Sequence, residues 1–206
     1  WFRFYGAIHL RSIMNVTVKE VLTSKEMKQF IYLPEKLNAD RPNWVPPFYA
    51  DDKRSFDSKR NPSHAYCDHI YALAYEGDKI VGRVAGIINK RFNSLSGSSN
   101  ARFGYIDAID SLEVFQALIC FVEEWARSKG MTKLIGPMGF TEEDPEGFII
   151  EGFNEVVTLA SYQNRESVPL YMEKLGFSKE VDYVVYNVQV AEAKTELYHK
   201  MFLRKS

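Results

Sequence analysis

Carboxylates crowd the segment from Thr141 to Phe153. Its sequence includes Glu142, Glu143, Asp144, Glu146 and Glu151. Such a concentration of negative charge could receive a cationic amine. The alternative is a solvated loop, because charged side chains stay at the surface unless they are paired. The segment therefore has two interpretations, an amine-binding surface and an exposed acidic loop.

Other residue types that carry chemistry are isolated in the sequence. His64 and His69 have no nearby ligand pattern, and Cys67 and Cys120 lie far apart without CxxC spacing, so we expect no metal. Two reduced thiols are typical of a cytoplasmic protein. The glycines between Gly77 and Gly86 form no GxGxxG pattern that opens a helix, and there is no GxSxG. A dinucleotide fold and a hydrolase nucleophile elbow are therefore unsupported.

The composition is that of a folded domain with balanced charge. The 206 residues are 46% hydrophobic and 14% aromatic, which is ample for a core. The 26 basic and 27 acidic residues give a net charge of −1, so we expect no nucleic-acid partner. No apolar run approaches the about 20 residues of a membrane span. We therefore expect a cytoplasmic protein without a membrane partner.

The chain divides into three segments. Residues 1–13 carry scattered aromatics and precede Met14, so we expect them to be an upstream or added segment. Residues 14–190 form the main domain. Residues 191–206 are expected to be a C-terminal helix or the beginning of a further segment.

Two helices are predicted by their apolar spacing. Val168, Tyr171, Met172 and Leu175 form one stripe, and Gly176 supplies a left-handed C-terminal cap. The longest stripe predicts a helix over residues 111–129 that ends at glycine 130. Thr23 or Ser24 is expected to cap a third helix, which the proline at position 34 bends or ends.

Strands are predicted between and around these helices. Alternating or β-rich runs fall at Val16–Leu22, His69–Asn89 (a hairpin), Arg102–Ile109, Thr132–Pro137 and Ser178–Val190. Phe92–Asn100 is expected to be a flexible, serine-rich connection. Simple alternation would place Phe103, Tyr105 and Asp107 on one face of their strand. The order of elements predicts a mixed α/β domain with a central sheet.

The chain resembles the GNAT superfamily of acyl-CoA-dependent N-acyltransferases. The resemblance depends on the hairpin, the strand and helix between Arg102 and Gly130, and Asn164 followed by Leu170-Tyr171 and Gly176-Phe177. It covers about residues 16–190. It implies a mostly antiparallel, splayed central sheet flanked by helices, a GNAT-like α/β fold.

A closer resemblance is to a poorly characterised GNAT-like family. Its marks are Trp44-Val-Pro-Pro, Asn61-Pro62, Gly82-Arg83, Gly136-Pro137 and the stretch from Gly147 to Phe153. Members of that family often continue into a second domain. The helix expected after Ala191 would then lie near the beginning of such a domain.

The resemblance implies transfer of an acyl group, such as acetyl, from acyl-CoA to a small amine. Tyr171 would protonate the leaving thiolate and Asp107 would be the general base. A half-buried structural tyrosine and a carboxylate that merely caps its strand are the alternative interpretations. The residues expected to contact acyl-CoA are Ile106, Ala108, Ile109, Ser111, Leu112 and Asn164.

The beginning of the long helix departs from the GNAT pattern. There the resemblance places Asp110, Glu113 and Phe115 where a basic residue and two glycines are common. Carboxylates at a helix N-terminus stabilise the helix but repel a pyrophosphate. Asp110 and Glu113 are spaced like an acidic capping box. The alternative function is therefore a degenerate ligand-binding or interaction domain that no longer binds CoA. A homodimer is compatible with either function.

Overall fold

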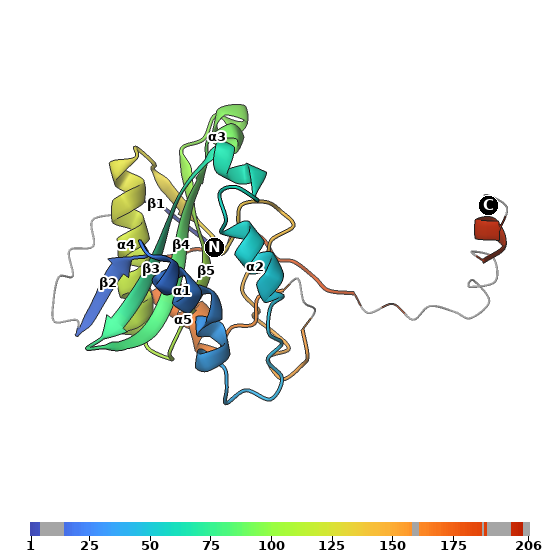
Figure 1. Cartoon of the computed structure of the whole chain (residues 1–206), viewed down its shortest axis with the longest axis horizontal. Helices are drawn as coiled ribbons and strands as arrows, with labels where there is room; N and C mark the ends of the chain where they lie inside the picture. Colours follow the sequence, from blue (N-terminus) through green and yellow to red (C-terminus); the bar gives the residue numbers. More distant parts are fainter. Residues whose placement is uncertain (5–14, 158–160, 187, 189–198, 204–206) are drawn as a thin grey trace.

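The computed structural model describes residues 1–4, 15–157, 161–186, 188 and 199–203 (Figure 1). Its strands form one six-stranded sheet in the order β1-β6-β5-β4-β3-β2. They are β1 (Phe2–Phe4), β2 (Val16–Glu20), β3 (Cys67–Glu76), β4 (Lys79–Asn89), β5 (Asn100–Ala108) and β6 (Lys133–Ile135). Only β5 and β6 pair in parallel. The expected mixed α/β fold with a mostly antiparallel sheet is confirmed.

Helices cover both faces of this sheet (Figure 1). They are α1 (Ser24–Leu37), α2 (Tyr49–Ser55), α3 (Lys90–Ser96), α4 (Leu112–Ser128) and α5 (Ser167–Lys174), with a short 3-10 helix at Pro62–Ala65. One apolar core joins the sheet to α4 and α5, and a second joins it to α1 and to Phe56 at the end of α2. No described helix has both the length and the apolar character needed to cross a bilayer.

Helix α1 begins as the sequence predicts and continues through a proline. Thr23 and Glu26 form a capping box at its N-terminus. Pro34 lies inside the helix and has no N–H to donate to the carbonyl of Phe30. The buried guanidinium of Arg83 donates to that carbonyl instead, at 2.9 Å. The proline therefore creates an acceptor for a cation on β4.

Strand β5 does not alternate simply. Tyr105 has a φ of 47°, and the pairing with β4 shifts between Arg83 and Ala85, which marks a β-bulge. Phe103 consequently packs into the core under α4, whereas Tyr105 packs into the core under α1. The expectation that Phe103 and Tyr105 share one face is wrong, because the bulge adds a residue to the strand.

Two further expectations differ from the structure. The connection after β4 contains α3, which Asn89 caps at its beginning and left-handed Gly97 ends. The described part of Ser178–Val190 forms no strand, since the edge of β6 is already paired with β1. Residues 199–203 are helical, and 191–198, expected to belong to the same helix, lie outside the described residues.

Candidate functional site

Strands β5 and β6 separate midway along β5. Their parallel pairing is confined to Asn100–Arg102 and Lys133–Ile135, and the last backbone contact is the N–H of Met138 donating to the carbonyl of Phe103 at 2.9 Å. Gly104 permits this approach, because a Cβ there would collide with the Met138 carbonyl. Beyond this contact the outer edge of β5 is no longer paired with β6.

Tyr162 occupies this opening. The backbone N–H of Ile106 donates to its hydroxyl oxygen at 3.2 Å. Its ring meets Phe148 edge-on, with centroids 5.9 Å apart. Burial raises the pKa of Tyr162 above its usual range, so the phenol stays protonated. Tyr162 lines a cavity on each side of the opening.

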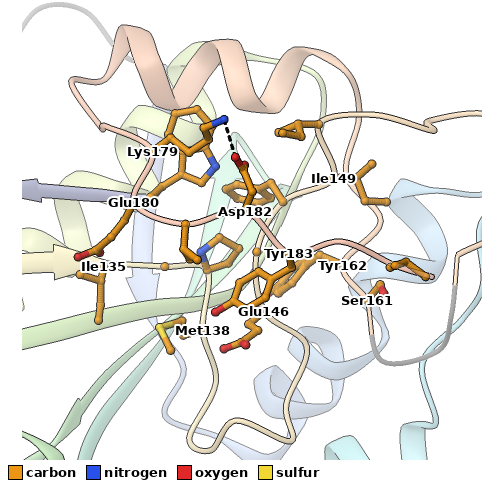
Figure 2. Close-up of a pocket in the computed structure, with 18 residues that line it drawn as sticks. Ile135, Met138, Glu146, Ile149, Ser161, Tyr162, Lys179, Glu180, Asp182 and Tyr183 are labelled. Atoms are coloured by element: carbon orange, nitrogen blue, oxygen red, sulfur yellow. Dashed lines mark ion pairs between the residues drawn. The ribbon is translucent and has the colours of Figure 1, made fainter.

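The first of these, the β6-side cavity, has a volume of about 180 Å³ and is largely apolar (Figure 2). Its walls include Ile135, Met138, Phe148, Ile149 and Tyr162. Figure 2 also shows an ion pair between Lys179 and Asp182, 3.0 Å long, at its margin. The lining of this cavity is thus mostly apolar, and Glu146, Lys179, Glu180 and Asp182 add charged groups to it.

The second, the α2-side cavity, has a volume of about 80 Å³ and is rich in carboxylates and aromatic rings. Its lining includes Pro34, Trp44, Asp52, Arg83, Tyr105, Asp107 and Tyr162. Arg83 donates from Nε to Asp107 Oδ2 at 2.9 Å, and its Nη2 lies 2.8 Å from the same oxygen. Only 5% of the Arg83 side chain and 20% of the Asp107 side chain are exposed. The guanidinium is therefore committed to Asp107 and to the α1 backbone.

Part of the acidic segment is exposed and part of it turns toward the protein. Glu142, Glu143 and Glu151 are exposed, as expected of a solvated loop. Asp144 turns inward, where its Oδ1 accepts from the Tyr105 hydroxyl at 2.9 Å and its Oδ2 accepts from the Thr141 N–H at 2.9 Å. Asp144 thus holds the Tyr105 ring in the wall of the α2-side cavity.

Asp52 was not anticipated from the sequence. Its Oδ2 is buried and has no hydrogen-bond partner among the described residues. The pKa of Asp52 is raised to about 6, chiefly by burial; Arg83 opposes the shift, and the charges of Asp107, Asp144 and Asp51 contribute to it. Nothing in the residue pattern of the short helix α2 distinguishes Asp52 from Asp51. Only the fold places one inward and the other outward.

At the beginning of α4, the cap differs from the sequence expectation. Ser111 is the N-cap, and its hydroxyl oxygen accepts from the Val114 N–H. The expected acidic capping box is therefore wrong. Asp110 instead accepts hydrogen bonds from the hydroxyls of Ser167 and Tyr171, the latter at 2.9 Å. The Ser167 bond, followed by the Tyr171 bond, lowers the pKa of Asp110, so this carboxylate stays charged.

Tyr171 and Asp107 are not adjacent. Tyr171 packs against the core under α4, and its ring lies 5.7 Å from the buried ring of Phe115. Desolvation and the bond to Asp110 raise the pKa of Tyr171. Asp107 pairs with Arg83, which reaches α1 on the other face of the sheet. The two residues therefore lie on opposite faces of the sheet, Tyr171 with the core under α4 and Asp107 with Arg83 on the α1 side.

The residues expected to contact acyl-CoA are mostly occupied by the protein itself. Asn164 accepts from the Ile149 N–H and donates to the carbonyls of Ile149 and Arg165. Ile106 donates to Tyr162, and the Ile109 N–H donates to the Val81 carbonyl. Ala108, Ile109 and Leu112 pack against the core, and Ser111 caps α4.

Cations that the sequence did not single out lie near Asp110. Arg41 and Arg165 line an open cavity of about 370 Å³ together with Asp110 and Ser167. Arg165 also pairs with Asp40 at 2.9 Å. Positive charge is therefore supplied here by residues far from the α4 turn in sequence, where a local motif cannot reveal it.

Comparison with known proteins gives relatives and a fold. The chain is 31% identical over 191 residues to Protein YghO of Escherichia coli K12, covering 91% of this chain and 47% of that protein. It is 29% identical over 173 residues to the bacterial ceramide synthase of Caulobacter vibrioides, covering 84% of this chain and 45% of that protein. The chain thus spans about half the length of these curated relatives. No family model matches it.

Solved structures with the same architecture are acetyltransferases. An aminoglycoside acetyltransferase from an uncultured soil sample superposes with a TM-score of 0.50 at 11% identity, covering 84% of this chain and 97% of that chain. A Pyrococcus furiosus protein described as an acetyl transferase superposes with a TM-score of 0.50 at 14% identity, covering 84% and 99%. The chain has a GNAT-like fold.

Proposed function

We propose that this domain transfers an acyl group from an acyl-CoA to a small amine. The observation that carries the proposal is the opening beside Ile106, with the half-buried carboxylates of Asp52 and Asp107 in the cavity on its α2 side. Tyr171, the proton donor expected from the sequence, packs on the α4 side of the sheet. The GNAT-like fold supports the proposal. A thioester in this opening would have a proton donor on the α4 side and a proton acceptor on the α2 side.

The reaction needs two proton transfers, one from the attacking amine and one to the leaving thiolate. The amine nitrogen attacks the thioester carbonyl carbon, so that an N–C bond forms and the C–S bond breaks. The leaving CoA thiolate takes the phenolic proton of Tyr171, and a carboxylate takes the proton lost by the amine. Asp107 is the base expected from the sequence, and its Oδ2 is held by Arg83.

The Tyr162 hydroxyl occupies the N–H of Ile106 that an acyl donor would use. The donor must therefore displace this hydroxyl, at the cost of one hydrogen bond that its own carbonyl can replace. The apolar β6-side cavity then supports an extended acyl chain. The name of the Caulobacter relative supports a long-chain amino alcohol as the first acceptor to test, because ceramides are N-acylated amino alcohols.

The acid–base roles are tested with Tyr171→Phe. Thiol release from acetyl-CoA and palmitoyl-CoA would be followed with a panel of primary amines that includes sphinganine. We expect kcat to fall about 100-fold, since proton transfer typically contributes at least that much, with little change in the Kd of the acyl-CoA. Tyr75→Phe on β3 is the matched control. Equal turnover in wild type and Tyr171→Phe would remove Tyr171 from the mechanism.

The second candidate is a degenerate domain that binds no CoA, and the carboxylates of Asp110 and Glu113 favour it. Each charge near a helix N-terminus is worth about 0.3–1 kcal/mol. We therefore expect Asp110→Asn/Glu113→Gln to tighten acyl-CoA binding about 3- to 30-fold, measured by calorimetry. Asp78→Asn, in the β3–β4 turn, is the control. Unchanged affinity in the double variant would show that these charges do not govern the donor site.

A further inference from the structure

We propose that Asp52 is the general base of this reaction and that the α2-side cavity holds the nitrogen of a primary amine against its carboxylate. This inference rests on the proposed function and assigns the acceptor side of it. It replaces Asp107 as the base and leaves Asp107 to position Arg83.

Two carboxylates near Asp52 are already bound by the protein. Asp107 also lines the cavity and accepts twice from Arg83 through its Oδ2, and Asp144, which is not among the lining residues, accepts from Tyr105 and Thr141. The Oδ2 of Asp52 is buried without a partner among the described residues. Because buried polar atoms are normally satisfied, a buried, unpaired carboxylate oxygen beside a cavity indicates a missing donor. An ammonium group would supply it.

The surrounding charges favour a cation. The groups that face Asp52 are Arg83 from β4, Asp107 from β5, Asp144 from the loop after β6, and Asp51 from its own helix. Arg83 is the cation among them, and its charge is balanced by Asp107. The remaining field at Asp52 is negative, so a cationic ligand is attracted and a carboxylate ligand is repelled.

The residues that line the cavity and its volume determine which kind of amine fits. The rings of Trp44, Tyr105 and Tyr162 line the cavity, and aromatic faces attract ammonium groups. The volume of about 80 Å³ accommodates a primary ammonium and its first carbons, since a water molecule accounts for about 30 Å³ of liquid. The rest of the acceptor would lie outside, toward solvent.

The protons balance with Asp52 and Tyr171 together. The Asp52 carboxylate first takes one proton from the bound ammonium, which frees the lone pair for attack, and releases it to solvent. As the N–C bond forms and the C–S bond breaks, Asp52 takes the second nitrogen proton, while Tyr171 protonates the thiolate and regains its own proton from solvent, so that one proton is released overall. The raised pKa of about 6 supports this role, because a base works best when its pKa lies near the working pH.

The test compares Asp52→Asn with Asp51→Asn, its exposed neighbour on the same helix. Hexylamine binding is measured by calorimetry without any acyl donor, with hexanol as the neutral analogue. We expect Asp52→Asn to weaken hexylamine at least about tenfold, the effect of losing one charged partner. Hexanol binding should not change, and Asp51→Asn should behave as wild type. Equal hexylamine affinity in Asp52→Asn and wild type would overturn the proposal.

Turnover separates this proposal from the proposed function. With acyl-CoA present, kcat/KM of wild type should rise with pH through about 6. In Asp52→Asn this rise of kcat/KM with pH should be absent. The rate should also be about 100-fold lower than that of wild type. If kcat/KM of Asp52→Asn still rises with pH through about 6, Asp52 is not the base. Loss of hexylamine binding in Asp52→Asn, in a protein whose wild type turns over no acyl-CoA, would support the amine site and contradict acyl transfer.

Discussion

Arg83→Met is expected to lower the free energy of unfolding by about 3–5 kcal/mol, the usual cost of removing one partner of a buried ion pair. Arg83 is 4% exposed. Its loss leaves the Asp107 carboxylate and the Phe30 carbonyl without their donor. The charge left behind, rather than the lost contact, accounts for most of the cost. Urea unfolding near neutral pH measures it.

Two variants identify the cause of this loss. Arg54→Met removes an exposed pair, in which 57% of the Arg54 side chain and 57% of the Asp51 side chain are accessible. It should cost less than about 1 kcal/mol. Adding Asp107→Asn to Arg83→Met should restore about 2 kcal/mol, because the orphaned charge disappears. A loss as small as that of Arg54→Met would show that the Arg83 pair does not hold α1 to the sheet.

Asp52→Asn is expected to stabilise the protein in a pH-dependent way. The pKa of Asp52 is raised by burial from 3.8 to about 6, so the folded state binds the proton more tightly than the unfolded state. Stability from this group is complete below about pH 4 and is lost as the pH rises toward 6, to a total of about 3 kcal/mol. Asp52→Asn has no ionisable group at this position, so its stability does not fall in this way as the pH rises. Its advantage over wild type should therefore grow by about 3 kcal/mol between pH 4 and pH 8.

Thermal and urea unfolding across this pH range provide the measurement, with Asp51→Asn as control. Because only the difference between variant and wild type is compared, titrations common to both cancel. A difference that stays constant with pH would mean that Asp52 ionises as freely in the folded protein as in the unfolded chain. A stabilising substitution that also abolishes amine binding is typical of a residue kept for function.

Much of the framework follows from local sequence. The helix over residues 111–129 is predicted within one residue at each end of α4, because its apolar stripe and glycine 130 agree. Helix α5 likewise ends before left-handed Gly176. In both helices, apolar periodicity and a glycine after the last turn specify the same C-terminal end.

The candidate site is less predictable because it depends on tertiary placement. The residue with positive φ in the bulge is Tyr105 rather than the neighbouring glycine, and the bulge changes which side chains of β5 share a face. Pro34 predicts a free carbonyl, but not that Arg83, distant in the chain, would bind it. Asp51 and Asp52 are chemically identical neighbours that only the packing of α2 distinguishes. Ser178–Val190 has a strand pattern, but β1 already occupies the edge of β6.

If this domain transfers acyl groups, it binds an acyl-CoA at the opening beside Ile106. Calorimetric titration of the wild-type protein with acetyl-CoA and palmitoyl-CoA tests it most directly, because binding is required whatever the acceptor amine. We expect saturable binding of at least one donor with a Kd below about 1 mM, equivalent to about −4 kcal/mol. No detectable binding of either donor at millimolar concentration would contradict the account and favour the degenerate domain.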